Sequence, residues 1–263
     1  MRRSVVVLLA GALSLGLMQI ASAADMPVKA PIMKAPMVVP YSWSGFYIGG
    51  NAGYHWTDAK FDWEFAPGFP DSAANIAARG GTAANTLRQR GFTGGLQIGY
   101  NWQFNNIVAG LEADFNFLGG SASFGPQYVG GGLPAANTVT ESARARWLAT
   151  VRPRLGILVM PRTLLYATGG LAVARVKYFD HTDYLASMQE ASQTTTRVGW
   201  TAGVGGEHAL DNRWSVKGEW LYADLGSTSY NSINNVFPTA ILTHNHKLTM
   251  NIVRLGINYK LTP

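Results

Sequence analysis

The sequence contains no cysteine and few charged residues, and both absences exclude classes of protein. Without cysteine the chain has no disulfides, no thiolate metal ligands and no cysteine nucleophile. Asp, Glu, Lys and Arg make up 14% of the residues, whereas soluble domains average about 25%. No apolar run of 18 residues follows the first two dozen residues, so we expect no transmembrane helix there.

The first 23 residues have the pattern of an export signal. Arg2 and Arg3 precede an apolar segment at residues 5–17, and Ala-Ser-Ala at residues 21–23 fits a signal cleavage site. A membrane anchor helix is the alternative, but the apolar segment is short for a span. We therefore expect residues 1–23 to be removed and the mature chain to be exported.

Residues 24–44 contain four prolines, which favour an extended chain and block a sheet interior. They are interpreted as a Pro/Lys-rich periplasmic leader, with a disordered tail as the alternative. From residue 45 to residue 263 the chain has many glycines and aromatic residues. An exported chain with few charges and no spanning helix suggests a transmembrane β-barrel. In such a barrel, apolar residues alternate with polar ones along each strand and do not form long runs.

Side chains alternate with a period of two from residue 45 onward. In residues 91–104 the apolar set is Phe92, Leu96, Ile98, Tyr100, Trp102 and Phe104, and glycine and polar residues fill the odd positions. Residues two apart share one face of a strand. The expected strands are 45–57, 91–104, 107–118, 144–158, 164–176, 197–209, 214–225 and about 247–260, with a bulge near Ile252 where the parity of the last strand shifts.

The connections between these strands alternate in length. Those at 105–106, 159–163 and 210–213 are short, whereas those at 58–90, 119–143, 177–196 and 226–246 are long and polar. Short turns on one side and long loops on the other are typical of outer-membrane barrels. The predicted fold is an all-β, eight-stranded antiparallel transmembrane up-and-down β-barrel with four long extracellular loops. A lipocalin-like soluble barrel in the periplasm is the structural rival, with its apolar face inward.

If lipid contacts the apolar face, the charged residues of the strands point into the lumen. The interior of an eight-stranded barrel is just wide enough for side chains, and unpaired charges there would be costly. We therefore predict a paired network that plugs the barrel, with four arginines of one strand facing carboxylates. Its members are Glu112, Asp114, Arg144, Arg146, Arg152, Arg154, Glu207, Lys217, Glu219 and Arg254, with Lys260 also facing inward.

Aromatic residues on the other face would form girdles at the two membrane interfaces, unless some simply pack between neighbours. They are Trp43, Trp56, Trp102, Trp147, Trp200, Trp214, Trp220 and Tyr222. Arg175 and Lys177 lie near the outer rim, where contact with lipopolysaccharide phosphates and plain solvation are both open.

Several segments resemble a known family. They are WSGFYIGGNAGYHW (43–56), FTGGLQIGYNWQF (92–104), LYATGGLAVARV (165–176), GWTAGVGGEHALDNRWSVKGEWLYADLG (199–226) and VRLGINYKL (253–261). The chain resembles the porin-family, eight-stranded surface barrels of alphaproteobacteria over essentially its whole mature length. The resemblance implies an abundant, surface-exposed barrel in the outer membrane of a Gram-negative cell. Such barrels usually end in an aromatic residue that the assembly machinery reads, and Tyr259 or Leu261 would substitute for it here.

The expected function is a structural, surface-interaction role without catalysis, cofactor or metal. Paired carboxylates are general acid–base candidates, but structural ion pairs cluster in the same way. His55 is expected inside the lumen, while His244 with His246 and His181 with Asp183 are weak metal candidates. The expected partners are outer-membrane lipid and lipopolysaccharide, the barrel-assembly machinery, and host or cell-surface ligands through the loops, but not nucleic acid. A small-solute porin is the alternative, followed by an outer-membrane lipid-modifying enzyme or protease.

Overall fold

The computed structural model describes residues 41–65, 85–128, 138–184, 187–233 and 241–261, so the predicted signal segment and the leader up to residue 40 lie outside the described residues. Within these residues, nine strands form one antiparallel sheet. The strands are β1 (Gly45–Phe65), β2 (Asn85–Phe104), β3 (Ile107–Leu118), β4 (Ala122–Tyr128), β5 (Thr138–Met160), β6 (Thr163–Tyr184), β7 (Ser187–Ala209), β8 (Trp214–Ile233) and β9 (Ile241–Lys260).

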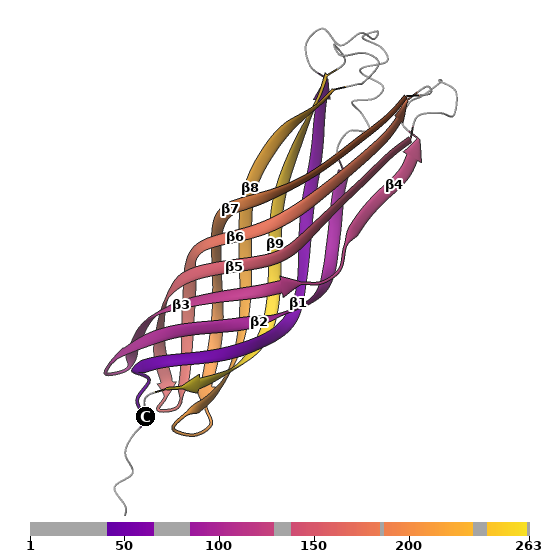
Figure 1. Ribbon diagram of the computed structural model, residues 1–263. Coiled ribbons are helices and arrows are strands. Elements are labelled where there is room, and N and C mark those ends of the chain that lie inside the picture. Colours follow the sequence, from indigo (N-terminus) through magenta and orange to yellow (C-terminus); the bar gives the residue numbers. More distant parts are fainter. Residues whose placement is uncertain (1–40, 66–84, 129–137, 185–186, 234–240, 262–263) are drawn as a thin grey trace, which may run out of the picture. The chain divides into compact units, whose positions relative to one another are not determined.

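The sheet closes on itself, which confirms the predicted up-and-down barrel. Strands pair with their neighbours in the chain, β1 also pairs with β9, and β3 pairs with β5, so every strand except β4 belongs to one ring of eight. Figure 1 shows β1 and β9, the first and last strands, side by side. The short strand β4 pairs with β5 beyond the end of β3. It lies in the segment 119–143, where a loop was expected, and that part of the prediction is wrong.

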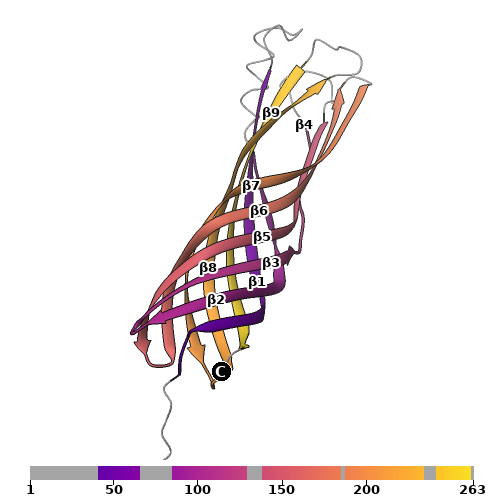
Figure 2. The same ribbon diagram turned by 60° about the vertical axis from the view of Figure 1, so that its left-hand side comes forward.

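The register fixes how far the strands tilt. Stepping from partner to partner around the ring, starting at Val198 on β7, leads back to β7 at His208, ten residues further along. With eight strands at their usual spacing, this stagger corresponds to a tilt of about 40°. The tilt is visible in the oblique course of β2, β3 and β5 in Figure 1 and Figure 2.

The strands are much longer than the sequence pattern predicted. Apart from β3 and β4 they contain 20 to 23 residues, although a tilted strand crosses a bilayer in about 9–11. The predicted loop at 177–196 is strand up to Tyr184 and again from Ser187. The outer face of these extensions lies beyond the apolar belt and can meet water, so outward polar side chains do not interrupt the backbone ladder. The loop prediction failed because alternation of apolar and polar residues ends where the apolar belt ends, while pairing continues.

The short turns lie at one end of the barrel, as predicted. Asn105 in the β2–β3 turn has a positive φ of 54°, a conformation that asparagine tolerates better than most residues. In the β7–β8 turn, the backbone N–H groups of Trp214 and Arg213 donate to Asp211 Oδ1, each at 2.7 Å, and lower the pKa of that carboxyl. The start of β1 and the end of β9 lie at this same end (Figure 1).

The outer face of the barrel is apolar and exposed. Phe92, Leu96 and Leu255 are 80%, 73% and 72% exposed, and the interior buries charged residues such as Arg152. This distribution is the reverse of that in a soluble barrel, and only hydrocarbon can solvate such an outer surface. No helix in the described residues has the length and apolarity to cross a membrane.

A β-bulge in β5 changes which arginines face the lumen. The β5–β6 register shifts between Ala145 and Trp147, so Arg146 is the extra residue. Below the bulge even-numbered residues of β5 are buried, and above it odd-numbered residues such as Ala145 are buried. Arg144 and Arg146 are therefore exposed on the outer face, and their assignment to the lumen network was wrong.

The expected bulge near Ile252 is absent from the described pairing of β9. The registers of β9 with β1 and with β8 pass through Ile252 without a shift. Leu248, Met250 and Ile252 point inward with Arg254 and are at most 1% exposed. The prediction assumed that apolar residues must face lipid, whereas the upper part of this lumen is itself apolar.

Single introduced cysteines should report these two faces, since the chain has none of its own. A nitroxide label at Leu96 should be accessible to oxygen dissolved in lipid, while a label at Gln97, which is 4% exposed, should be shielded. Leu171 and Ala172 form a second pair with the same expectation, being 52% and 0% exposed. Equal surroundings for both members of either pair would contradict this barrel.

Candidate functional site in the barrel lumen

The middle of the lumen contains a compact group of ionised side chains. Its members come from β3, β5, β7, β8 and β9, and each is at most 6% exposed. They carry four positive and four negative formal charges, so the group is neutral. This ionic layer consists of Glu112, Asp114, Arg152, Arg154, Glu207, Lys217, Glu219 and Arg254.

Arg152 lies at the centre of the ionic layer. Its Nη2 is 2.8 Å from both Glu112 Oε1 and Asp114 Oδ2, on the neighbouring strand β3. Its Nη1 is 3.1 Å from Glu219 Oε1 on β8, across the lumen. One guanidinium thus joins strands on opposite sides of the ring, which its planar set of five donors permits.

Lys217 and Arg254 complete the charge balance around the same carboxylates. Lys217 Nζ donates to Glu112 Oε1 and Oε2 at 2.7 and 2.8 Å. Arg254 Nη2 is 2.6 Å from Glu219 Oε2 and 3.1 Å from Asp114 Oδ2. Each of these carboxylates therefore contacts at least two cations, and their oxygens are already occupied as hydrogen-bond acceptors.

Arg154 forms a second centre, nearer to the short turns. Its Nη1 is 3.0 Å from Glu207 Oε2, and its Nε donates to Asn101 Oδ1 at 2.9 Å. The guanidinium carbon lies 4.9 Å from the ring centroid of Tyr47 and 5.1 Å from that of Tyr166. Contact with two aromatic faces suits a desolvated arginine.

Neutral residues that the charge-based prediction omitted satisfy the remaining oxygens. The Tyr47 hydroxyl donates to Glu112 at 2.7 Å, and the Tyr166 hydroxyl donates to Glu219 at 3.1 Å. Thr150 Oγ1 donates to Asp114 at 2.6 Å, and Asn258 Nδ2 donates to Glu207 at 2.8 Å. All four occupy inward positions of their strands, so the same alternation that located the charges could have located them.

An apolar layer lies above the ionic layer, toward the long extensions. On β3 the inward residues change from Glu112 and Asp114 through Asn116 to Leu118, and on β5 they change from Arg152 through Thr150 to Leu148. This layer is one cluster of buried apolar side chains in the upper lumen. Its larger members are Phe61, Leu87, Leu118, Leu148, Val176, Tyr178, Leu221, Leu225, Leu248, Met250 and Ile252.

Arg197 crosses this apolar layer, and the sequence analysis did not single it out. It is 5% exposed and donates to the carbonyl oxygens of Leu225, Gly226 and His246. The β8–β9 register shifts between Asp224 and Ser227, and Arg197 binds carbonyls at this irregularity. Arg197 has the same odd parity as Glu207 on β7, so continuing the alternation would have placed it inward.

The segment before β1 closes the lumen at the short-turn end. Trp43 is 2% exposed and packs in a cluster with Val108, Leu164, Tyr166 and Ala209, with Tyr41 against it. The expected place of Trp43 in an outward aromatic girdle was therefore wrong, because the segment before β1 turns inward. The Trp43 backbone N–H donates to Gln103 Oε1 at 2.7 Å, and Lys260 Nζ donates to the Ser42 carbonyl at 2.6 Å. Burial, with the negative charge of Glu207, raises the pKa of the Tyr41 phenol to about 12.

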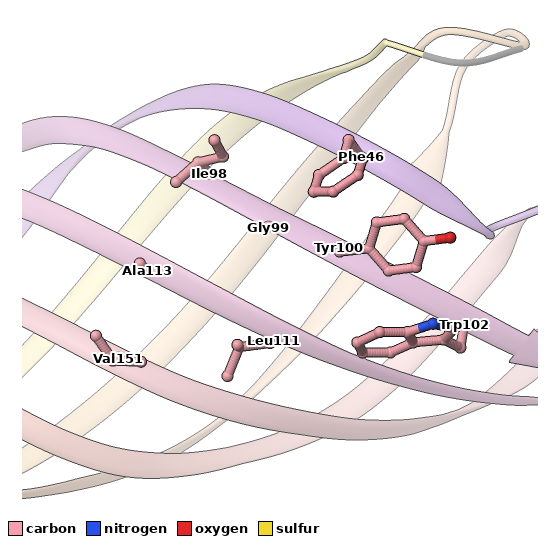
Figure 3. Close-up of a pocket in the computed structure, with 8 residues that line it drawn as sticks. All are labelled: Phe46, Ile98, Gly99, Tyr100, Trp102, Leu111, Ala113 and Val151. Atoms are coloured by element: carbon pink, nitrogen blue, oxygen red, sulfur yellow. The ribbon is translucent and has the colours of Figure 1, made fainter.

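The other predicted aromatic residues point outward at several heights. Trp102, Trp200, Trp214 and Trp220 are 41–52% exposed, and Trp56, Trp147 and Tyr222 are partly exposed. Near Trp102 the outer face has an apolar hollow of about 490 Å³, where the small side chain of Ala113 leaves space between larger ones (Figure 3). The hollow opens to the lipid side of the barrel and presents no ionised group.

The histidines offer no metal site in the part of the chain that the structure describes. His55 faces inward, with Nδ1 3.1 Å from Thr57 Oγ1 and Nε2 3.0 Å from the Gly119 carbonyl. His208 faces outward, 3.0 Å from Thr163 Oγ1. Among the described residues, no group of three or more His, Asp or Glu side chains could hold a metal ion.

The chain is similar to proteins of the bacterial outer membrane. Residues 10–260 match the family model described as outer membrane protein beta-barrel domain. The 31 kDa outer-membrane immunogenic protein of Brucella melitensis is 37% identical over 246 residues, covering 91% of this chain and 93% of the relative. The 22 kDa outer membrane protein of Rhizobium leguminosarum is 29% identical, covering 86% and 82%. OprG from Pseudomonas aeruginosa, a solved structure, has 9% identity, a TM-score of 0.43 and coverage of 84% and 99%.

Removing one charge from the ionic layer should destabilise the barrel far more than removing an exposed charge. Glu112→Gln leaves Lys217 and Arg152 with an incomplete counter-charge, and we expect a loss of about 3–5 kcal/mol in the free energy of unfolding. The matched control is Asp58→Asn, since Asp58 and Arg88 form an exposed pair at 3.5 Å, with an expected change of about 0–1 kcal/mol.

Urea unfolding of the refolded barrel in lipid vesicles measures both values. Adding Lys217→Met to Glu112→Gln restores charge balance and should recover part of the loss. Equal, small effects of the buried and exposed substitutions would show that the ionic layer does not stabilise the barrel.

Proposed function

This chain belongs to the outer membrane protein beta-barrel family and lies in the outer membrane, and on that premise we propose that it is a structural, surface-contact protein with a closed lumen. In this proposal the belt of outward apolar residues anchors the chain in lipid. The strand extensions beyond the belt, with the connections between them, present its surface to other cells or envelope components.

The observation that carries the closed lumen is the ionic layer across the middle of the barrel. Arg152 and Arg254 are 0% and 1% exposed and join carboxylates from strands on different sides of the ring. The apolar layer lies above it and Trp43 below it, so a solute would have to displace side chains at three heights. Moving Arg152 alone would separate it from Glu112, Asp114 and Glu219.

The porin alternative requires a continuous water-filled path through these layers. Through the part of the barrel that the structure describes, such a path would require the ion pairs to rearrange, because the strands are fixed by their ladder. The neutral charge balance and the neutral donors on the remaining oxygens argue against easy rearrangement. A non-conducting barrel is therefore the function that this geometry favours.

Surface contact is supported by the length of the strands. Antiparallel pairs continue past the apolar belt in β1 with β9, β5 with β6 and β6 with β7 (Figure 2). A paired extension presents side chains at fixed positions, as a binding surface requires. The Brucella relatives are named outer-membrane immunogenic proteins, which is consistent with exposure of these extensions at the cell surface.

We propose no catalytic role. A general acid or base needs a carboxylate that can exchange protons with a substrate. Glu219, one of the candidate carboxylates, is held by Arg152, Arg254 and Tyr166 in the closed interior. The lipid-modifying enzyme and the protease would need a cleft that reaches such a group.

The same reasoning gives the proposed partners. Outer-membrane lipid contacts the apolar belt, and the assembly machinery reads the last strand during insertion. Tyr259 near the end of β9 packs against Trp214 at 4.9 Å between ring centroids and accepts a hydrogen bond from Arg213, so it serves as the terminal aromatic residue in this proposal.

Planar-bilayer recordings test the closed lumen. The purified barrel should give no steady, size-dependent current. The double variant Arg152→Ala/Arg254→Ala, which empties the centre of the ionic layer, should show frequent openings, whereas Arg88→Ala at the exposed pair should behave like the wild type. Steady currents from the wild type that larger solutes block would favour the porin.

Shortening the extensions tests surface contact. Replacing residues 180–191 with an Asn-Gly turn that joins Phe179 to its partner Ser192, together with a similar cut beyond the pair Ser229 and Asn245, keeps the membrane part intact. The shortened barrel should insert and keep heat-modifiable gel mobility, while adherence of the cells to surfaces or host cells should fall. Unchanged adherence at equal surface abundance would remove the surface-contact role.

A further inference from the structure

Four cationic side chains lie together on the outer face of β5 and β6. Arg144 is the direct cross-strand partner of Lys177, and Arg175 pairs with Trp147, next to the bulged Arg146. All four side chains are exposed. Directly opposed residues in an antiparallel pair lie about 4.5–5.5 Å apart at Cβ, and diagonal neighbours about 7–8 Å. The four charges therefore form one group, the β5–β6 cationic cluster.

The β-bulge creates this cluster. Without the extra residue, the even parity of Arg152 and Arg154 would continue to Arg146 and Arg144 and would place two more cations inside. The bulge moves both to the outer face, beside Arg175 and Lys177. The ionic layer inside stays neutral, and the outer face gains two positive charges at one place.

No carboxylate of the described residues neutralises the cluster. Two other exposed cations beyond the apolar belt have partners, since Arg88 lies 3.5 Å from Asp58 and Lys247 lies 3.5 Å from Asp224. Within the described ranges, none of the four cluster cations forms an ion pair. Like charges directly opposite each other destabilise a strand pair, so an external anion would relieve a cost that the fold carries.

The cluster begins where the apolar belt ends. On β5 the outward apolar residues extend from Ile157 to Trp147, ten residues apart, which at the tilt of this barrel is about 25 Å along its axis. The ring of Trp147 contacts Phe115, with centroids 5.5 Å apart, and marks the boundary. Arg146 and Arg144 follow at once, at the level of lipid headgroups on the side away from the short turns.

We propose that the β5–β6 cationic cluster binds the phosphate groups of a phosphorylated lipid in the outward-facing leaflet of the outer membrane. Three guanidinium groups supply paired donors that match phosphate oxygens. Thr194 and Thr196 on β7, the partners of Lys177 and Arg175, are exposed and add hydroxyl donors. The acyl chains of the same lipid would lie against the apolar belt below. This site is independent of the proposed surface-contact role and of the state of the lumen.

Binding to nanodiscs tests the site with the full mature chain. The refolded barrel is placed in phosphatidylcholine nanodiscs with increasing diphosphoryl lipid A, and occupancy is measured by native mass spectrometry. Arg144→Gln/Arg146→Gln should weaken binding by about 25-fold, at about fivefold per cation. The matched control Arg88→Gln/Lys247→Gln removes the same charge from paired positions and should weaken it by less than about threefold. Equal losses, or no loss in the cluster variant, would overturn the proposal.

Two further measurements separate a lipid site from other origins of the cluster. Inorganic phosphate in large excess should not displace lipid A, and displacement at concentrations similar to that of the lipid would make free phosphate the ligand and overturn the lipid assignment. Lys177→Glu replaces a repulsion with an attraction to Arg144, so without lipid A it should be at least as stable as the wild type. With lipid A only the wild type should gain thermal stability. Lower stability of Lys177→Glu without lipid A would give the cations a structural role instead.

Discussion

The whole structure depends on one constraint: a closed antiparallel ladder exposes alternate side chains to two different surroundings. The ladder satisfies the backbone hydrogen bonds, so neither surrounding has to supply them. Outside, Phe92 and Leu96 meet hydrocarbon, and inside, Gln97 and Arg152 meet other side chains. A shift of one residue in any strand would exchange these faces, which makes the register costly to change. In the described pairings the register shifts lie outside the apolar belt, at Leu158–Met160 next to a short turn and at the other end beyond Trp147.

Charge neutrality in the middle of the lumen follows from the same constraint. Ionised groups removed from water need partners of opposite charge. The four cations Arg152, Lys217, Arg254 and Arg154 each lie within 3.0 Å of a carboxylate oxygen. Two further arginines in this space would have left an excess of positive charge. The bulge at Arg146 removes that excess from the interior and places both arginines on the outer face, beside Arg175 and Lys177.

Membership of the outer membrane family accounts for the barrel fold, and the side chains that fill its lumen bear on whether solutes can pass. From the short turns to the extensions, the lumen contains Trp43, the ionic layer and the apolar layer. These layers make conduction of solutes the less favoured function. In that case, sequence differences between relatives would alter contacts with other cells or envelope components mainly where they fall in the extensions of β5, β6 and β7. In the proposed function, the residues that stabilise the barrel and the residues that make contacts therefore lie at different heights along the strands.

The sequence by itself determined the barrel, its eight-membered ring, its short turns and the inward placement of Glu112, Asp114, Arg152, Glu207 and Glu219, because period-two alternation is a local property of a strand. Tertiary structure decided the rest. The bulge that turns Arg144 and Arg146 outward is defined by pairing with β6, and the inward apolar set of Leu248, Met250 and Ile252 is defined by facing other apolar side chains across the lumen. The rule that apolar side chains face outward holds only where lipid surrounds the barrel. Above the belt the interior is apolar and the outside is water, so the rule assigns these side chains to the wrong face.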